Sequence, residues 1–266
     1  MAAFETLTVE RRGRVALVTF RRADQLNAMN RAMQGEIIAA MESLSADAGI
    51  GAIVLTGEGR GFMAGADIKE YAAQTGPEFD AFQERGAWMY RSVEENRKPV
   101  IAAVNGFALG GGFELVLCCD LVVAAAGAKL GLPEIKIGLV PGGGGTQRSV
   151  AKLGRNRANF LLMTGAIVPA EDFVASGLVN EIVPAEALLE RALALAGTIA
   201  AEPPAAIEGL KQLTALAAAG ETDKGLAAEQ ALVTALYRSE TGQERVQAFA
   251  RKSAERAAAK AKGGPA

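Results

Sequence analysis

The first part of the chain alternates between short strand-like runs and helix-like stripes. Residues 4–9 alternate apolar and polar positions, and residues 14–20 run back after the turn at residues 11–13, which predicts a β-hairpin. Continuous apolar runs at residues 52–56, 100–104 and 121–125 predict buried strands. A helix is predicted from the capping residue Asn30 to about Leu44; its apolar face comprises Met33, Ile37, Ala40, Met41 and Leu44.

Glycine-rich segments follow the predicted strands and precede predicted helices. They cover residues 57–67, 105–114 and 138–146. From residue 185 onward the pattern is helical and rich in alanine. We therefore expect an α/β core over residues 1–195 and a helical C-terminal region over residues 196–266. An apolar stripe at Leu226, Val233 and Leu236 is suited either to docking on the protein's own core or to contact with a neighbouring subunit.

Composition limits the chemistry available. The chain of 266 residues contains no histidine, which excludes Ser-His-Asp and Cys-His catalysis and most zinc sites. Proton transfer near neutral pH must then fall to Glu, Asp, Lys, Tyr or Cys. Lys and Arg number 28 against 30 Asp and Glu, a balance that argues against nucleic acid as a partner.

Other sequence features predict a cytoplasmic protein. The only cysteines are the neighbours Cys118 and Cys119, which suits a reducing compartment. The N-terminal residues lack the pattern of a signal peptide. No apolar run approaches the roughly 20 residues that a membrane span requires, so no membrane contact is expected.

Two of the glycine-rich loops are candidates for a site made from main chain. If the loops near Ala66 and Gly111 lie side by side, two backbone N–H groups converge on one oxygen and form an oxyanion hole. Such a hole suits a reaction in which a carbonyl gathers negative charge. Glu114 and Glu134 lie beside Gly or Pro breaks, and paired carboxyls in an apolar cleft can divide into an acid and a base.

Three segments in the same order and spacing resemble the enoyl-CoA hydratase/isomerase (crotonase) family. They are residues 62–70, 105–115 and 132–148, and the likeness runs from the first hairpin to about Arg251. The resemblance implies a crotonase-like spiral of ββα units. It also implies helical C-terminal elements that form a homotrimer, often as a dimer of trimers.

The resemblance further implies a substrate and a site. The substrate is an acyl-CoA thioester, so that coenzyme A belongs to the substrate and no separate cofactor or metal is expected. The oxyanion-hole amides fall on Ala66 and Gly111, and the two catalytic residues on Glu114 and Glu134. The residues expected to bind the substrate are Leu26, Ala28, Ala64, Asp67, Ile68 and Lys69.

Retention of both glutamates favours an enoyl-CoA hydratase, which adds water across C2=C3 of a trans-2-enoyl-CoA to give a 3-hydroxyacyl-CoA. Two alternatives stay open: a Δ3,Δ2-enoyl-CoA isomerase using Glu134, and a non-catalytic or RNA-binding member of the fold. The chain departs from the family at residues 21–24, which lack the usual proline, and near residues 248–257. The basic residue that binds the CoA 3′-phosphate is therefore not identified, and acyl-chain length is also left open.

Overall fold

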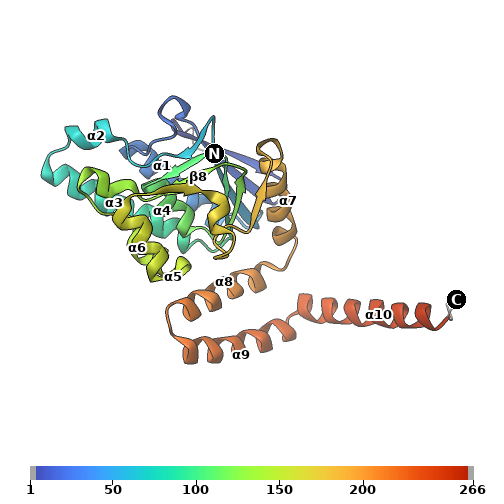
Figure 1. The fold of residues 1–266 in the computed structure, drawn as a ribbon. Coiled ribbons are helices and arrows are strands. Elements are labelled where there is room, and N and C mark those ends of the chain that lie inside the picture. Colours follow the sequence, from blue (N-terminus) through green and yellow to red (C-terminus); the bar gives the residue numbers. More distant parts are fainter. Residues whose placement is uncertain (1–3, 263–266) are drawn as a thin grey trace. The chain divides into compact units, whose positions relative to one another are not determined.

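The computed structural model describes residues 4–262 (Figure 1). By its internal contacts the chain forms two units. The first extends to Glu202 and the second begins at Pro203. Helix α7 (Leu188–Ala200), at the end of the first unit, packs on the strands of its six-stranded sheet, so this unit extends a few residues past the predicted end of the α/β core. Within the described residues, no helix is both long and apolar enough to cross a membrane.

A six-stranded sheet forms the centre of the first unit. Its strand order is β1-β2-β3-β5-β7-β10, and every neighbouring pair is parallel except the β1–β2 hairpin. The hairpin predicted from the sequence is confirmed. The strands are β1 (Leu7–Arg12), β2 (Val15–Phe20), β3 (Ala52–Gly57), β5 (Val100–Val104), β7 (Leu121–Ala125) and β10 (Glu181–Val183).

A second sheet of four short strands has the order β4-β6-β8-β9. Strands β4, β6 and β8 run parallel to one another, and β9 runs antiparallel to β8. The strands are β4 (Gly61–Met63), β6 (Phe107–Leu109), β8 (Lys129–Gly131) and β9 (Ile167–Pro169). Each has only three residues, so hydrogen bonds to neighbouring strands, rather than local propensity, must hold them in place.

The chain alternates between these two sheets as it proceeds. Strands β3, β5 and β7 join the large sheet, and the strand that follows each of them joins the small one. Helices then lead back to the large sheet, after the third pair by way of β9 of the small sheet. This repeated β-β-helix order confirms the predicted spiral of ββα units.

The helices of the first unit cover both faces of the large sheet. Helix α1 begins where the sequence predicts, because the Asn30 side chain accepts a hydrogen bond from Met33 N at 2.9 Å. Residues 170–176 form a short 3₁₀ turn and further turns. The helices are α1 (Arg31–Ala46), α2 (Ile68–Ala73), α3 (Gly76–Glu94), α4 (Gly111–Cys118), α5 (Gly145–Leu153), α6 (Arg155–Thr164) and α7 (Leu188–Ala200), with 3₁₀ turns η1 (Ala23–Gln25), η2 (Pro133–Ile137), η3 (Ala170–Phe173) and η4 (Ala185–Ala187).

Side-chain alternation along each strand divides the apolar core into two layers. In β5, Ile101 and Ala103 face α7, while Val100, Ala102 and Val104 face the larger cluster that includes residues of α1, α3 and α4. Burial on both faces explains why the strand reads as an unbroken apolar run. Figure 1 shows α7 separated by the sheet from those other helices.

As far as Lys262, the second unit consists of three helices and the turns between them: α8 (Pro204–Ala218), α9 (Thr222–Arg238) and α10 (Glu240–Lys262). Helices α8 and α9 pack closely at Gly209, where a Cβ atom would lie 2.2 Å from Leu232 Cδ2. Large apolar side chains remain exposed on this unit, including Val233 at 55% and Phe249 at 75%.

Candidate active site

Three loops meet at one edge of the small sheet. Ala66 follows β4, Gly111 follows β6 and Glu134 follows β8. Because β4, β6 and β8 are neighbouring parallel strands, their carboxyl ends lie together, which is where ligands bind in open parallel sheets. The alternation of the chain between two sheets therefore brings together residues separated by up to 68 positions in the sequence.

The backbone N–H groups of Ala66 and Gly111 lie near one another. A Cβ atom on Gly111 would lie 4.0 Å from Ala66 N, and one on Gly65 would lie 3.8 Å from Gly111 N. Neither N–H donates a hydrogen bond within the described residues. Gly111 begins α4, so its amide also lies at the positive end of the helix dipole. The two amides are thus available to an oxygen atom of a ligand.

Main-chain contacts hold these two amides in place. Met29 N donates to Gly65 O at 2.7 Å and Asp67 N donates to Met29 O at 2.9 Å, which fixes the residues on both sides of Ala66. At the neighbouring loop, a Cβ atom on Gly112 would lie 1.8 Å from Met63 O. Only glycine permits this approach of α4 to β4.

Glu114 lies on the first turn of α4 and is only 3% exposed. Its Oε1 accepts hydrogen bonds from Gly143 N at 2.7 Å and from Gly145 N at 2.8 Å. Burial raises the pKa of this carboxyl, while the two amides and the charge of Arg148 oppose the rise. The two amides, together with a hydrogen bond from the Tyr90 side chain, hold this carboxyl in one orientation against the cavity.

Arg148 holds the loop that binds Glu114. Its Nη1 donates to Gly143 O at 2.5 Å, and its Nε and Nη2 bind Glu94 at 2.8 and 2.6 Å. Glu94 lies on α3 and Arg148 on α5, so the pair also joins these two helices. Gly143, whose amide binds Glu114, is therefore fixed through its carbonyl by Arg148. Arg148 is itself held by its bidentate ion pair with Glu94.

Glu134 lies in the 3₁₀ turn η2, next to the oxyanion loop. A Cβ atom on Gly110 would lie 2.9 Å from Glu134 Oε1. Its Oε2 is buried and has no hydrogen-bond partner among the described residues. Burial, together with the negative charge of Glu114, raises the pKa of Glu134 to about 7. At neutral pH this carboxyl therefore has both a protonated and an ionised population, as a proton-transfer group requires.

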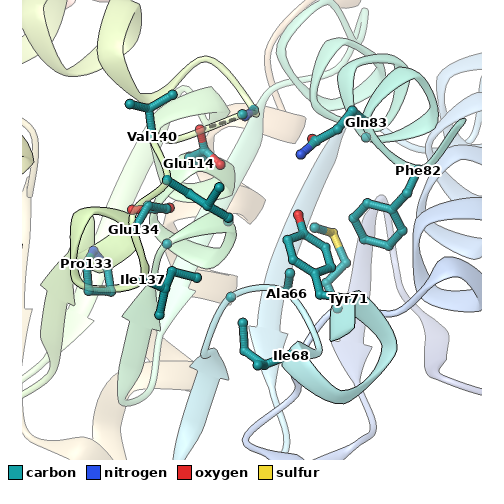
Figure 2. Close-up of a pocket in the computed structure, with 18 of the residues that line it drawn as sticks. Ala66, Ile68, Tyr71, Phe82, Gln83, Glu114, Pro133, Glu134, Ile137 and Val140 are labelled. Atoms are coloured by element: carbon teal, nitrogen blue, oxygen red, sulfur yellow. Dashed lines mark hydrogen bonds between the residues drawn. The ribbon is translucent and has the colours of Figure 1, made fainter. Parts of the chain in front are cut away.

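A cavity of about 460 Å³ contains all four groups, since Ala66, Gly111, Glu114 and Glu134 line it. Figure 2 shows the two glutamates on one side and Tyr71, Phe82 and Gln83 across the cavity. The Tyr71 ring packs edge-on against Phe79 at 5.3 Å and Phe82 at 5.1 Å between centroids. The cavity thus has an acidic side and a largely aromatic side.

The six residues expected to bind the substrate divide into two groups. Ala64 and Ile68 line the cavity, whereas Leu26, Ala28, the α2 N-cap Asp67 and the α2 residue Lys69 are not part of its wall. Asp67 caps α2 through Lys69 N and binds Arg22 at 2.8 Å, which lowers the pKa of Asp67.

Several residues of the site escape prediction from the sequence, namely Met29, Gln34, Tyr90, Arg148 and the amides of Gly143 and Gly145. The Tyr90 hydroxyl donates to Gly111 O at 3.1 Å. A signal existed for Gln34, since it occupies the buried stripe of α1 with Ile37 and Met41, where a polar residue is unexpected.

Comparison with known proteins identifies the class. The family model described as "Enoyl-CoA hydratase/isomerase" matches residues 10–256. A protein of Rhizobium meliloti named "Probable enoyl-CoA hydratase" is 41% identical over 94% of this chain and 96% of its own length. The "2,3-dehydroadipyl-CoA hydratase" of Escherichia coli is 37% identical over 92% and 96% of the two chains.

Solved structures agree with these matches. A crystal structure described as an enoyl-CoA hydratase subunit of Geobacillus kaustophilus has a TM-score of 0.89 and 39% identity, covering 94% of this chain and 97% of that one. The chain belongs to the enoyl-CoA hydratase/isomerase family. The crotonase-like fold predicted from the sequence is confirmed.

Proposed function

We propose that the protein hydrates trans-2-enoyl-CoA thioesters to 3-hydroxyacyl-CoA. The observation that supports this function best is the presence, in one cavity, of two unbonded main-chain amides and two carboxyls, one buried and one partly buried. The amides suit a thioester oxygen that becomes an enolate, and the carboxyls suit the movement of two protons. Family membership and relatives named as hydratases support the same reaction.

In the proposed mechanism, Ala66 N and Gly111 N donate to the thioester oxygen. Each donor of this kind contributes roughly 2.7–4 kcal/mol to transition-state stabilisation. The oxygen of a water adds to C3 and breaks the C2=C3 π bond. The electron pair moves onto the thioester oxygen as an enolate. C2 then takes up a proton as the carbonyl re-forms, so the reaction consumes one water and needs no redox step or cofactor.

The environments of the two glutamates favour different roles. Glu114 has one oxygen held by two amides, which favours its carboxylate form as the base that takes a proton from water. Glu134 has a pKa of about 7 and an unpaired buried oxygen, which favours it as the acid that protonates C2. Each turnover leaves Glu114 with one proton more and Glu134 with one proton fewer. Transfer of a proton from Glu114 to Glu134 restores the site.

Hydration of crotonyl-CoA, followed as loss of the conjugated thioester's absorbance, tests this function. We expect Glu114→Gln and Glu134→Gln each to lower kcat by roughly 10²–10⁴-fold, the range for one acid or base. Glu171→Gln is the matched control, because that carboxylate accepts from Gly127 N at the surface. Near-normal rates in both site variants would refute the assignment.

The same cavity also favours one alternative reaction. An unpaired oxygen on Glu134 beside two oxyanion donors suits a proton shuttle between C2 and C4, which is Δ3,Δ2-enoyl-CoA isomerisation. Parallel assays with 2-enoyl-CoA and 3-enoyl-CoA distinguish the two activities. A 3-enoyl-CoA turned over faster than crotonyl-CoA would make isomerisation the principal function.

The remaining parts of the prediction belong to the same proposal. The loops at Leu26, Ala28, Asp67 and Lys69 adjoin the cavity at a place suited to the nucleotide end of CoA. The exposed apolar side chains of the second unit support an oligomerisation role, and a trimer or dimer of trimers would have three or six times the chain's 27.5 kDa. Light scattering measures that mass. The cytoplasmic location remains a prediction that cell fractionation tests.

A further inference from the structure

One polar side chain in the cavity wall has no role in the proposed mechanism. Gln34 of α1 is fully buried, yet it forms part of the wall that Glu114 and Glu134 also line. Its Nε2 donates to Phe82 O at 3.3 Å, and its Oε1 has no partner within the described residues. Because Phe82 O is an acceptor, the orientation of the amide is set, and the unpaired atom must be the carbonyl oxygen.

Such an atom is unusual in the interior of a folded protein, where buried polar groups are nearly always paired. Neither neighbour fixed by contacts supplies a side-chain donor to this oxygen, since Phe82 O is an acceptor and Gly86 has no side chain. The unpaired oxygen therefore points to a ligand that brings its own donor.

A glycine leaves room beside this amide. Gly86 lines the cavity, and a Cβ atom there would lie 3.1 Å from Gln34 Nε2. Any larger residue at position 86 would therefore press on the amide. On the same side, the Tyr71 side chain hydrogen-bonds to Gln83. Gln34 Oε1 is a buried acceptor without a partner among the described residues.

We infer that Gln34 is a specificity-determining residue whose Oε1 accepts a hydrogen bond from a hydroxyl group on the acyl chain of the substrate. The inference deepens the proposed function and rests on it, because it assigns the aromatic side of the cavity to the acyl tail. A carboxylate-ended tail is excluded at this position, since an amide oxygen repels it. The two glutamates add negative charge to the same cavity, whereas Lys136 is the one basic residue in the described wall.

Equilibrium binding tests this inference without requiring turnover. Calorimetry would compare saturated acyl-CoAs of six, eight and ten carbons that end in a methyl, a hydroxyl or a carboxylate group. At one of these lengths we expect the hydroxyl compound to bind about tenfold more tightly than its methyl counterpart. The carboxylate compound should bind more weakly than either.

Variants then locate the effect. In Gln34→Leu and Gln34→Met, the affinity for the hydroxyl compound divided by that for the methyl compound should fall to about one. This ratio is insensitive to partial loss of folded protein, because both affinities are measured on the same sample. Gln212→Leu, the same change on the exposed face of α8, should keep the preference. No hydroxyl preference at any length, tighter binding of the carboxylate, or a preference that survives in both Gln34 variants would overturn the inference. Failure to hydrate crotonyl-CoA would instead overturn the proposed function.

Discussion

Replacing Glu134 by Gln should stabilise the folded protein at alkaline pH. The pKa of this carboxyl rises from its ordinary value of 4.5 to about 7 on folding, mainly through burial. Between these two values the folded state binds more protons than the unfolded state, so the free energy of unfolding falls as pH rises. This loss of stability is absent below 4.5, the pKa of Glu134 in the unfolded chain, and complete above about 7, its pKa in the folded protein. Gln cannot ionise and escapes this loss.

The size of the effect follows from the pKa values. The step from 4.5 to about 7 is about 2.5 units, and at about 1.36 kcal/mol for each unit it corresponds to at most about 3.4 kcal/mol. Glu134 is partly accessible to solvent, which screens its charge, so we expect about 1–2 kcal/mol. The advantage of the variant over the native protein should appear between about pH 5 and pH 7 and stay constant above that range.

Urea unfolding of both proteins at pH 5 and pH 8 measures the difference. Glu78→Gln is a control whose effect should be nearly equal at pH 5 and pH 8, because the backbone and side chain of Thr75 lower the pKa of Glu78 from its ordinary value of 4.5. Glu78 stabilises the protein above its ordinary pKa, and this stabilisation is lost as pH falls. A Glu134→Gln advantage that is equal at both pH values would refute the reasoning, since a change of packing alone is independent of pH.

Two further predictions concern the supports of the site. Arg148→Met should lower kcat about 10- to 100-fold by releasing the Gly143 loop. It should also move the acid limb of the pH profile of kcat/KM to higher pH, because the Arg148 charge holds the pKa of Glu114 down. Arg148→Lys, which keeps the charge, is the control. An acid limb that stays in place in Arg148→Met would contradict this reasoning. Gly112→Ala should cost about 2 kcal/mol or more in urea unfolding, because its Cβ would collide with Met63 O. Gly35→Ala, with open space around it, should not destabilise.

Elements with strong local patterns could be predicted from the sequence. Helix α1 with its Asn30 cap matches the predicted bounds closely, because capping and helical periodicity act within one segment. Strands β4, β6 and β9 were not predicted. A three-residue strand is too short to show alternation, and its existence depends on partners distant in the chain.

The candidate site likewise combines residues that the sequence identifies with contacts that it does not reveal. Its glutamates and glycine-rich loops stand out in the sequence because Gly and Glu at those positions follow a recognisable family pattern. The bond from Arg148 to Glu94 joins residues 54 positions apart, and no local rule predicts such a pair. The unpaired oxygen of Gln34 is likewise a property of the packed interior, since its absent partner cannot be read from neighbouring residues.

The parallel order of β4, β6 and β8 has a consequence for how such a protein can diversify. In the proposed mechanism, successive repeats supply separate groups: the first contributes Ala66 N, the second contributes Gly111 N and the base Glu114, and the third contributes the acid Glu134. An altered turn after β8 would change the delivery of a proton and leave the two amides for the thioester oxygen intact. New reactions on the same activated thioester are thus accessible through substitutions confined to one connection.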